Sequence, residues 1–98
     1  MFDQMKKLME MKKQAEKIKR ELEASLIEVN DVAGMKIVID GSQQFHSIEV
    51  DESFLSSDKK QLLQKELLKG VNKAIAKSQT LAAQQMKQAM GLGGLPGF

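Results

Sequence analysis

Apolar residues recur at helical spacing in two long stretches, one at each end of the chain. The first predicted helix covers residues 2–23, and its seam starts at Met1 and repeats at alternating steps of three and four, with Gln4 as the polar exception: Met1, Leu8, Met11, Ala15, Ile18 and Leu22. Residues 59–90 contain no proline and show similar spacing, with Ser78 as one small polar member: Leu63, Leu67, Val71, Ala74, Ser78 and Leu81. These patterns predict a long amphipathic helix over each stretch. Gly70 interrupts the second at a cost of about 1 kcal/mol relative to alanine, so we expect a helix or strand to approach it closely.

Between the two helices the period of apolar residues changes to two. This alternation predicts three antiparallel strands, at residues 26–31, 35–40 and 44–50. Turns at Val32-Ala33-Gly34 and at Asp40-Gly41 join them, and Asp-Gly between alternating runs is a strong hairpin signal. The expected fold is α+β with the order α-β-β-β-α. It is a three-stranded meander flanked by two long helices, in a single domain over residues 1–90, followed by a flexible glycine-rich tail over residues 91–98.

The alternation also assigns side chains to the two faces of the sheet, if both turns contain an even number of residues. One face then collects Leu26, Met35, Ile37, Ile39, Ile48 and Val50. The other face collects Ile27, Val29, Val38 and Phe45. Two helices leave little to cover a second apolar face, and exposed apolar patches usually mark interfaces. We therefore predict a homodimer through the second face, against the alternative of a monomer with one helix on each face.

Charge is segregated along the chain. Residues 59–90 hold seven lysines and one acid, residues 24–58 hold one lysine and seven acids, and residues 1–23 hold seven bases and five acids. Four of the lysines recur at every fourth position and form a slanting ridge on the predicted helix: Lys65, Lys69, Lys73 and Lys77. Positive charge gathered on helices indicates a polyanionic partner. The alternative is a solvated face that keeps the protein soluble.

The sequence lacks the residues that catalysis and metal binding need. Cysteine is absent, and His46 is the single histidine, so a zinc site is not expected. A histidine beside a hairpin turn is more often hydrogen-bonded or exposed at a rim than catalytic. No nucleophile with an adjacent base and no cofactor fingerprint is present, so we predict neither enzyme activity, nor a cofactor, nor a small-molecule substrate. No stretch approaches the roughly 20 apolar residues of a membrane span, which favours the cytoplasm.

The ordered set of motifs resembles the YbaB/EbfC family of bacterial nucleoid-associated proteins. The resemblance covers almost the whole chain and rests on several runs: Lys13–Glu16 within the first helix, Ala33–Gly41, Ile48–Asp51, Val71–Ala74 and Gly94–Gly97. The chain departs from the family pattern in three places. The first turn has one glycine, Glu52 stands where proline is common, and Gly70 and Lys73 flank Val71-Asn72 in place of the usual alanine and acid.

The resemblance implies a tweezer-like homodimer whose helical arms project from a sheet body. It implies binding of duplex DNA with weak sequence preference, in the nucleoid. By position, the contact residues are the lysine ridge together with bases of the first helix: Lys6, Lys13 and Arg20. Arg20 is the only arginine, which argues against base-specific reading through bidentate arginine. Two other hypotheses stay open: a coiled-coil adaptor that binds proteins, and an RNA-associated protein.

Overall fold

The computed structural model describes residues 2–89. Helix α1 spans Phe2–Ala24, strands β1, β2 and β3 span Leu26–Val29, Met35–Asp40 and Phe45–Val50, and helix α2 spans Lys60–Ala89. Two short 3-10 turns, Glu52–Phe54 and Ser57–Lys59, connect β3 to α2. The strands form one antiparallel sheet in the order β1-β2-β3. The predicted α-β-β-β-α order and meander are confirmed, while the predicted tail at residues 91–98 lies outside the described residues.

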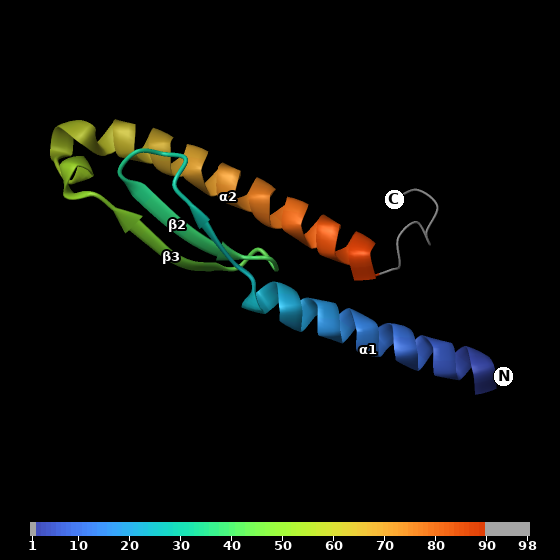
Figure 1. Ribbon diagram of the computed structural model, residues 1–98. Helices are drawn as coiled ribbons and strands as arrows, with labels where there is room; N and C mark the ends of the chain where they lie inside the picture. The colour runs from blue at the N-terminus through green and yellow to red at the C-terminus, as the bar shows by residue number, and fades with distance from the viewer. Residues whose placement is uncertain (1, 90–98) are drawn as a thin grey trace.

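The helices are much longer than the sheet they accompany. At about 1.5 Å per residue, α2 is about 45 Å long, whereas a six-residue strand spans about 20 Å. Figure 1 shows α2 lying along one face of the sheet and α1 projecting from the end where β1 begins. The molecule is accordingly elongated, 67 Å by 23 Å by 16 Å.

The core forms where the middle of α2 lies on β1 and β2. Ile37 and Ile39 of β2 are fully buried there, with Val29 of β1, against Ala74 of α2. A Cβ atom at Gly70 would lie 2.8 Å from Cδ1 of Ile37. The close approach predicted for Gly70 is therefore confirmed, and the approaching element is a strand.

The predicted division of side chains between the two faces is wrong for β1 and for Phe45. Ile27 pairs with Ile39 and Val29 pairs with Ile37, so both β1 residues lie on the face that α2 covers. The turn between β1 and β2 has an odd number of residues, which reverses the assumed parity. A bulge between Val38 and Ile39 then places Phe45 opposite Ile39. The prediction overlooked both effects because neither turn length nor a bulge is fixed by alternation.

The uncovered face of the sheet is consequently mostly polar, with Leu26 and Val38 as its apolar members. The register places Glu28, Val38 and Ser47 in one row and Lys36 beside Glu49 in another. Lys36 Nζ lies 3.4 Å from Glu28 Oε1. The expectation of a second apolar face is not met, and of the four residues predicted for an interface there, only Val38 belongs to the uncovered face.

Helix α1 packs against the rest of the chain through its second half, where Gln14 Nε2 also donates to the carbonyl of Ala89 in α2 at 2.5 Å. Ile18 and Leu22 are its buried residues, and the backbone N–H of Gly41 donates to the carbonyl of Leu22 at 2.8 Å. A Cβ atom at Gly41 would lie 3.1 Å from that same carbonyl oxygen, so the turn fits tightly against the helix end. The first half of α1 exposes large apolar side chains: Phe2, Met5, Leu8, Met9 and Met11, each at least 61% exposed.

Candidate nucleic-acid interface

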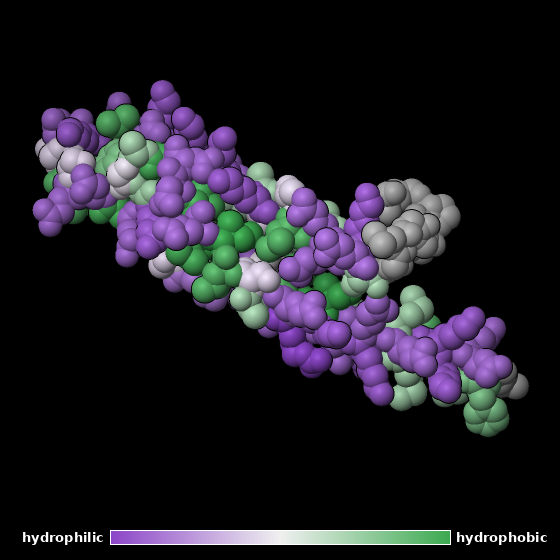
Figure 2. Space-filling model, viewed as in Figure 1, coloured by the Kyte–Doolittle hydropathy of each residue, from purple (hydrophilic) through white to green (hydrophobic). Residues whose placement is uncertain are grey.

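The lysine ridge lies on the exposed side of α2. Four-residue steps advance about 40° around a helix of 3.6 residues per turn, so the ridge turns by about 120° between Lys65 and Lys77. All four lysines are exposed, and Lys77 comes next to the buried Ser78. The ridge therefore begins on the outer side of the helix and ends beside the sheet. Figure 2 shows hydrophilic residues along the outer side of α2 and apolar residues gathered between it and the strands.

Asp31, in the turn between β1 and β2, binds the end of the ridge that reaches the sheet. Its Oδ1 accepts a hydrogen bond from Lys77 Nζ at 2.7 Å, and its Oδ2 lies 3.7 Å from Lys73 Nζ. The hydrogen bond from Lys77 lowers the pKa of Asp31, and the charges of both lysines add to this effect against a smaller opposing effect of burial. The structure therefore brings together two of the four ridge lysines at one carboxylate.

The other half of the ridge is not neutralised in this way. Within the described residues, neither Lys65 nor Lys69 forms an ion pair, and both side chains are exposed. These two lysines are one helical turn apart, about 6 Å along the axis. They offer two adjacent positive charges to solvent.

The candidate bases of α1 form a separate group. Lys6, Lys13 and Arg20 recur at seven-residue steps, which places them along one side of the helix, and all three are exposed. That side faces away from Ile18 and Leu22, the residues by which α1 packs against the rest of the chain. Over residues 2–89 none of the three takes part in an ion pair. The two basic groups thus lie on different helices, α1 and α2.

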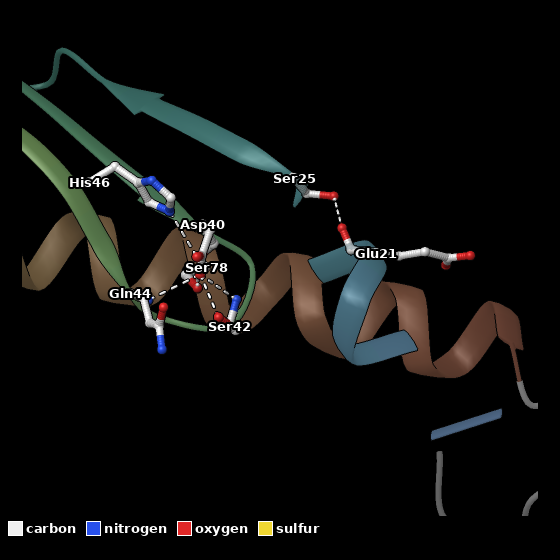
Figure 3. A network of polar contacts seen from close by, with 7 residues as sticks. All are labelled: Glu21, Ser25, Asp40, Ser42, Gln44, His46 and Ser78. Atoms are coloured by element: carbon white, nitrogen blue, oxygen red, sulfur yellow. Dashed lines mark hydrogen bonds and ion pairs between the residues drawn. The ribbon is translucent and has the colours of Figure 1, made fainter. Parts of the chain in front are cut away.

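A polar network holds the turn between β2 and β3 against α2, and Figure 3 shows its members. Oδ1 of Asp40 accepts hydrogen bonds from the Ser42 N–H at 2.8 Å, the Ser42 hydroxyl at 2.6 Å and the Gln44 N–H at 3.1 Å. His46 Nε2 lies 2.9 Å from the other oxygen, Oδ2. The Ser78 hydroxyl donates to the Asp40 carbonyl at 2.7 Å, linking the turn to α2. His46 is therefore hydrogen-bonded, as its position predicted.

The Asp40 carboxylate is stabilised in its charged form. Burial alone would raise its pKa, but hydrogen bonds from Ser42, His46 and Gln44 outweigh burial and lower the pKa to about 2. A carboxylate in this state is a structural acceptor and a poor general base, because it hardly binds a proton near neutral pH. The geometry of the network is that of a structural element that holds the β2–β3 turn in place against α2. The sequence showed its Asp-Gly turn but gave no sign that Ser78 would reach it.

Other kinds of site find little support in the part of the chain that the structure describes. No group of three or more His, Cys, Asp or Glu side chains is placed to hold a metal ion among residues 2–89. A cavity of about 390 Å³ lies between α1 and α2, and glutamine side chains dominate its polar lining: Gln14, Gln85 and Gln88. No described helix is long and apolar enough to span a membrane.

Comparison with known proteins gives consistent matches along the chain. The model of the YbaB/EbfC DNA-binding family matches residues 1–94. A nucleoid-associated protein of Ruminiclostridium cellulolyticum is 35% identical over 96 residues, covering 96% of this chain and 84% of its own length. One from Syntrophobacter fumaroxidans is 28% identical over 98 residues, covering 99% and 89%. The crystal structure of an uncharacterized protein from Helicobacter pylori shares the fold, with a TM-score of 0.78 at 16% identity over 93% of this chain and 98% of that one.

Proposed function

The chain belongs to the YbaB/EbfC DNA-binding family, and on that premise we propose that it binds duplex DNA as a homodimer with little sequence preference. The observation that carries the proposal is the exposed lysine ridge of α2, of which Lys65 and Lys69 stand without an acidic partner in the described structure. The basic side of α1, with Lys6, Lys13 and Arg20, supplies a second set of cations.

Lysine chemistry supports contact with phosphate rather than with bases. A lysine ammonium is a flexible point charge that neutralises a phosphate in many orientations. Arginine, which reads guanine through two fixed hydrogen bonds, occurs once in the chain. Contacts to the backbone position a protein on DNA but carry no sequence information. Low sequence preference follows from this composition.

The names of the relatives also support a location for this protein in the cell. Three curated relatives, of 28% to 35% identity, are named nucleoid-associated proteins. We propose that this chain likewise acts on the nucleoid, in the bacterial cytoplasm. The family is described by DNA binding, so the role that we propose is that of a binding protein and not of an enzyme.

The homodimer is proposed through α1 in place of the sheet. The uncovered sheet face is mostly polar, whereas α1 exposes an apolar seam in its first half. Leu8 and Met11 continue the same seam as Ile18 and Leu22, which are buried within the chain. A second copy that supplies the missing surface for Leu8 and Met11 would extend this packing and place two basic helices near one another.

Sedimentation tests this interface. Wild-type protein is expected to be dimeric at micromolar concentration, and a Leu8→Gln, Met11→Gln variant is expected to be monomeric. Each of these side chains contributes roughly 1.5–3 kcal/mol when buried, glutamine suits a helix, and the charge does not change. The matched control is Leu55→Gln, Leu68→Gln, which changes residues 69% and 64% exposed in the connector before α2 and on α2 itself.

Each outcome of this experiment has a defined reading. A monomeric wild type contradicts the homodimer. A dimeric α1 variant contradicts α1 as the interface. If Val38→Gln dissociates the dimer and the α1 variant does not, the interface is the uncovered sheet face.

Titration of random duplex DNA at several salt concentrations tests the function itself. We expect log affinity to fall linearly with log salt at roughly 0.9 per phosphate neutralised. The two unpaired ridge lysines of each protomer give four contacts in a dimer, so the slope should reach about −3.6 or steeper. Duplexes of different sequence should bind alike. Stronger binding to RNA of matched length would favour the RNA-associated alternative, and absence of binding to either would favour the protein adaptor.

A further inference from the structure

We propose that Asp31 acts as a built-in competitor for DNA phosphate, holding Lys73 and Lys77 in an internal ion pair and so limiting how much of the ridge engages DNA. This inference rests on the proposed function, because it assigns a role to a residue within the proposed binding surface. It concerns an acid in a turn of the sheet, outside both basic helices.

The geometry makes Asp31 a substitute for a phosphate. One carboxylate oxygen accepts a hydrogen bond from Lys77 and the other faces Lys73, with Nζ–O distances of 2.7 Å and 3.7 Å. A phosphate group presents anionic oxygens to lysine in the same way. Both lysines remain about half exposed, at 44% and 53%, so a nucleic acid can reach them. The side chain of Asp31 is 27% exposed, and its bonds to the lysines are open to competition from solvent anions.

The consequence is a shortened ridge. Lys65 and Lys77, the ends of the ridge, are 12 residue steps apart, about 18 Å along the axis, whereas the unpaired Lys65 and Lys69 are about 6 Å apart. Asp31 also cancels one of the four charges of the ridge. Any phosphate that engages Lys77 must displace the carboxylate, which then stays nearby as an uncompensated like charge and weakens the contact. DNA affinity is therefore set below the value that the ridge lysines alone would give.

Replacing Asp31 by asparagine keeps the shape of the side chain and removes its charge. We expect Asp31→Asn to tighten binding to random duplex roughly tenfold near physiological salt. The salt slope should steepen by up to about 1.8, for one further phosphate contact in each protomer of a dimer. Fluorescence anisotropy across a salt series measures both quantities, and thermal melting confirms the fold. Asp31→Ser serves as a second variant with the same expectation.

Glu28→Gln is the matched control. It removes one negative charge from an exposed acid that pairs with Lys36 on the uncovered sheet face, so it reproduces the change in net charge away from the ridge. Its affinity for DNA should change less than twofold. If the folded Asp31 variants bind no more tightly than Glu28→Gln, the proposed competition is wrong and the Asp31 ion pairs serve only to hold the turn.

A heparin column separates failure of this inference from failure of the proposed function. The Asp31 variants should elute at higher salt than both wild type and Glu28→Gln, because heparin is a polyanion that also engages exposed lysines. If no protein binds duplex DNA and the elution shift is present, DNA binding is refuted and masking of the ridge by Asp31 stands. Equal elution of all the proteins contradicts the masking.

Discussion

Changing Lys65 and Lys69 together to glutamate is expected to abolish measurable binding to duplex DNA near physiological salt. Four phosphate contacts are lost per dimer, and four negative charges then face the DNA in their place. Loss of the contacts alone should reduce the salt slope by about 3.6 and the affinity by at least roughly 100-fold. Both side chains are exposed, and lysine and glutamate have similar helix propensities, so helicity and the dimer should persist.

The controls separate local charge from overall charge. Lys65→Gln, Lys69→Gln should weaken binding to an intermediate degree, because it removes the attraction without adding repulsion. Lys36→Glu reverses a charge on the uncovered sheet face and should weaken binding far less. Anisotropy titrations at several salt concentrations, with circular dichroism and sedimentation on the same samples, give the comparison. A folded dimeric glutamate variant with wild-type affinity would exclude the ridge and leave Lys6, Lys13 and Arg20 of α1 as the binding surface.

The sequence predicted the elements well because their signals are local. A helical period over more than twenty residues and an Asp-Gly turn between alternating runs depend only on neighbours in the chain. The main differences lie at strand ends. Strand β1 ends at Val29 although it was predicted to continue to residue 31, because the chain turns after Val29 and places Asp31 beside Lys77 of α2.

The assignment of faces failed because it depends on the exact number of residues between paired positions. An error of one residue moves every side chain of a strand to the other face. Ile27 and Val29 were placed on an open face and instead complete the core under α2. The bulge beside Val38 has no clear signature in sequence, yet it alone decides where Phe45 lies. The apolar seam of α1, by contrast, was visible from spacing alone.

The proposed binding surface was predictable in part. The ridge appears in the sequence as a four-residue repeat of lysine, and the structure places all four side chains in solvent. Asp31 was not predictable as a member, because it is 46 residues away from Lys77 and meets it only through the packing of α2 on β1. Long-range ion pairs of this kind follow from tertiary structure, and no period in the sequence reports them.

The largest effect on stability is expected from Asp40. Replacement by alanine leaves the Ser42 hydroxyl, two backbone N–H groups and His46 without their acceptor, in a turn where Asp40 itself is 1% exposed. Hydrogen bonds to a charged group contribute roughly 1.5–3 kcal/mol each, and solvent can replace some of these, so we expect a loss of about 3 kcal/mol in the free energy of unfolding. Urea denaturation of wild type and variant at the same protein concentration measures this loss. Asp51→Ala is the control, because Asp51 accepts a hydrogen bond from the Ser53 hydroxyl in an exposed loop and the loss of that bond should matter much less.

The same carboxylate should make stability depend on acid. Its pKa falls from the usual 3.8 to about 2 on folding, so the folded state favours the charged form. The contribution is complete above pH 3.8 and is lost as the pH falls through about 2. A shift of this size corresponds to roughly 2.4 kcal/mol. Because His46 is 44% exposed, screening should leave about 1–2 kcal/mol of it. Urea midpoints measured from pH 5 to pH 2 should fall more steeply for wild type than for Asp40→Asn, and parallel curves for the two proteins would show that Asp40 does not control the acid sensitivity.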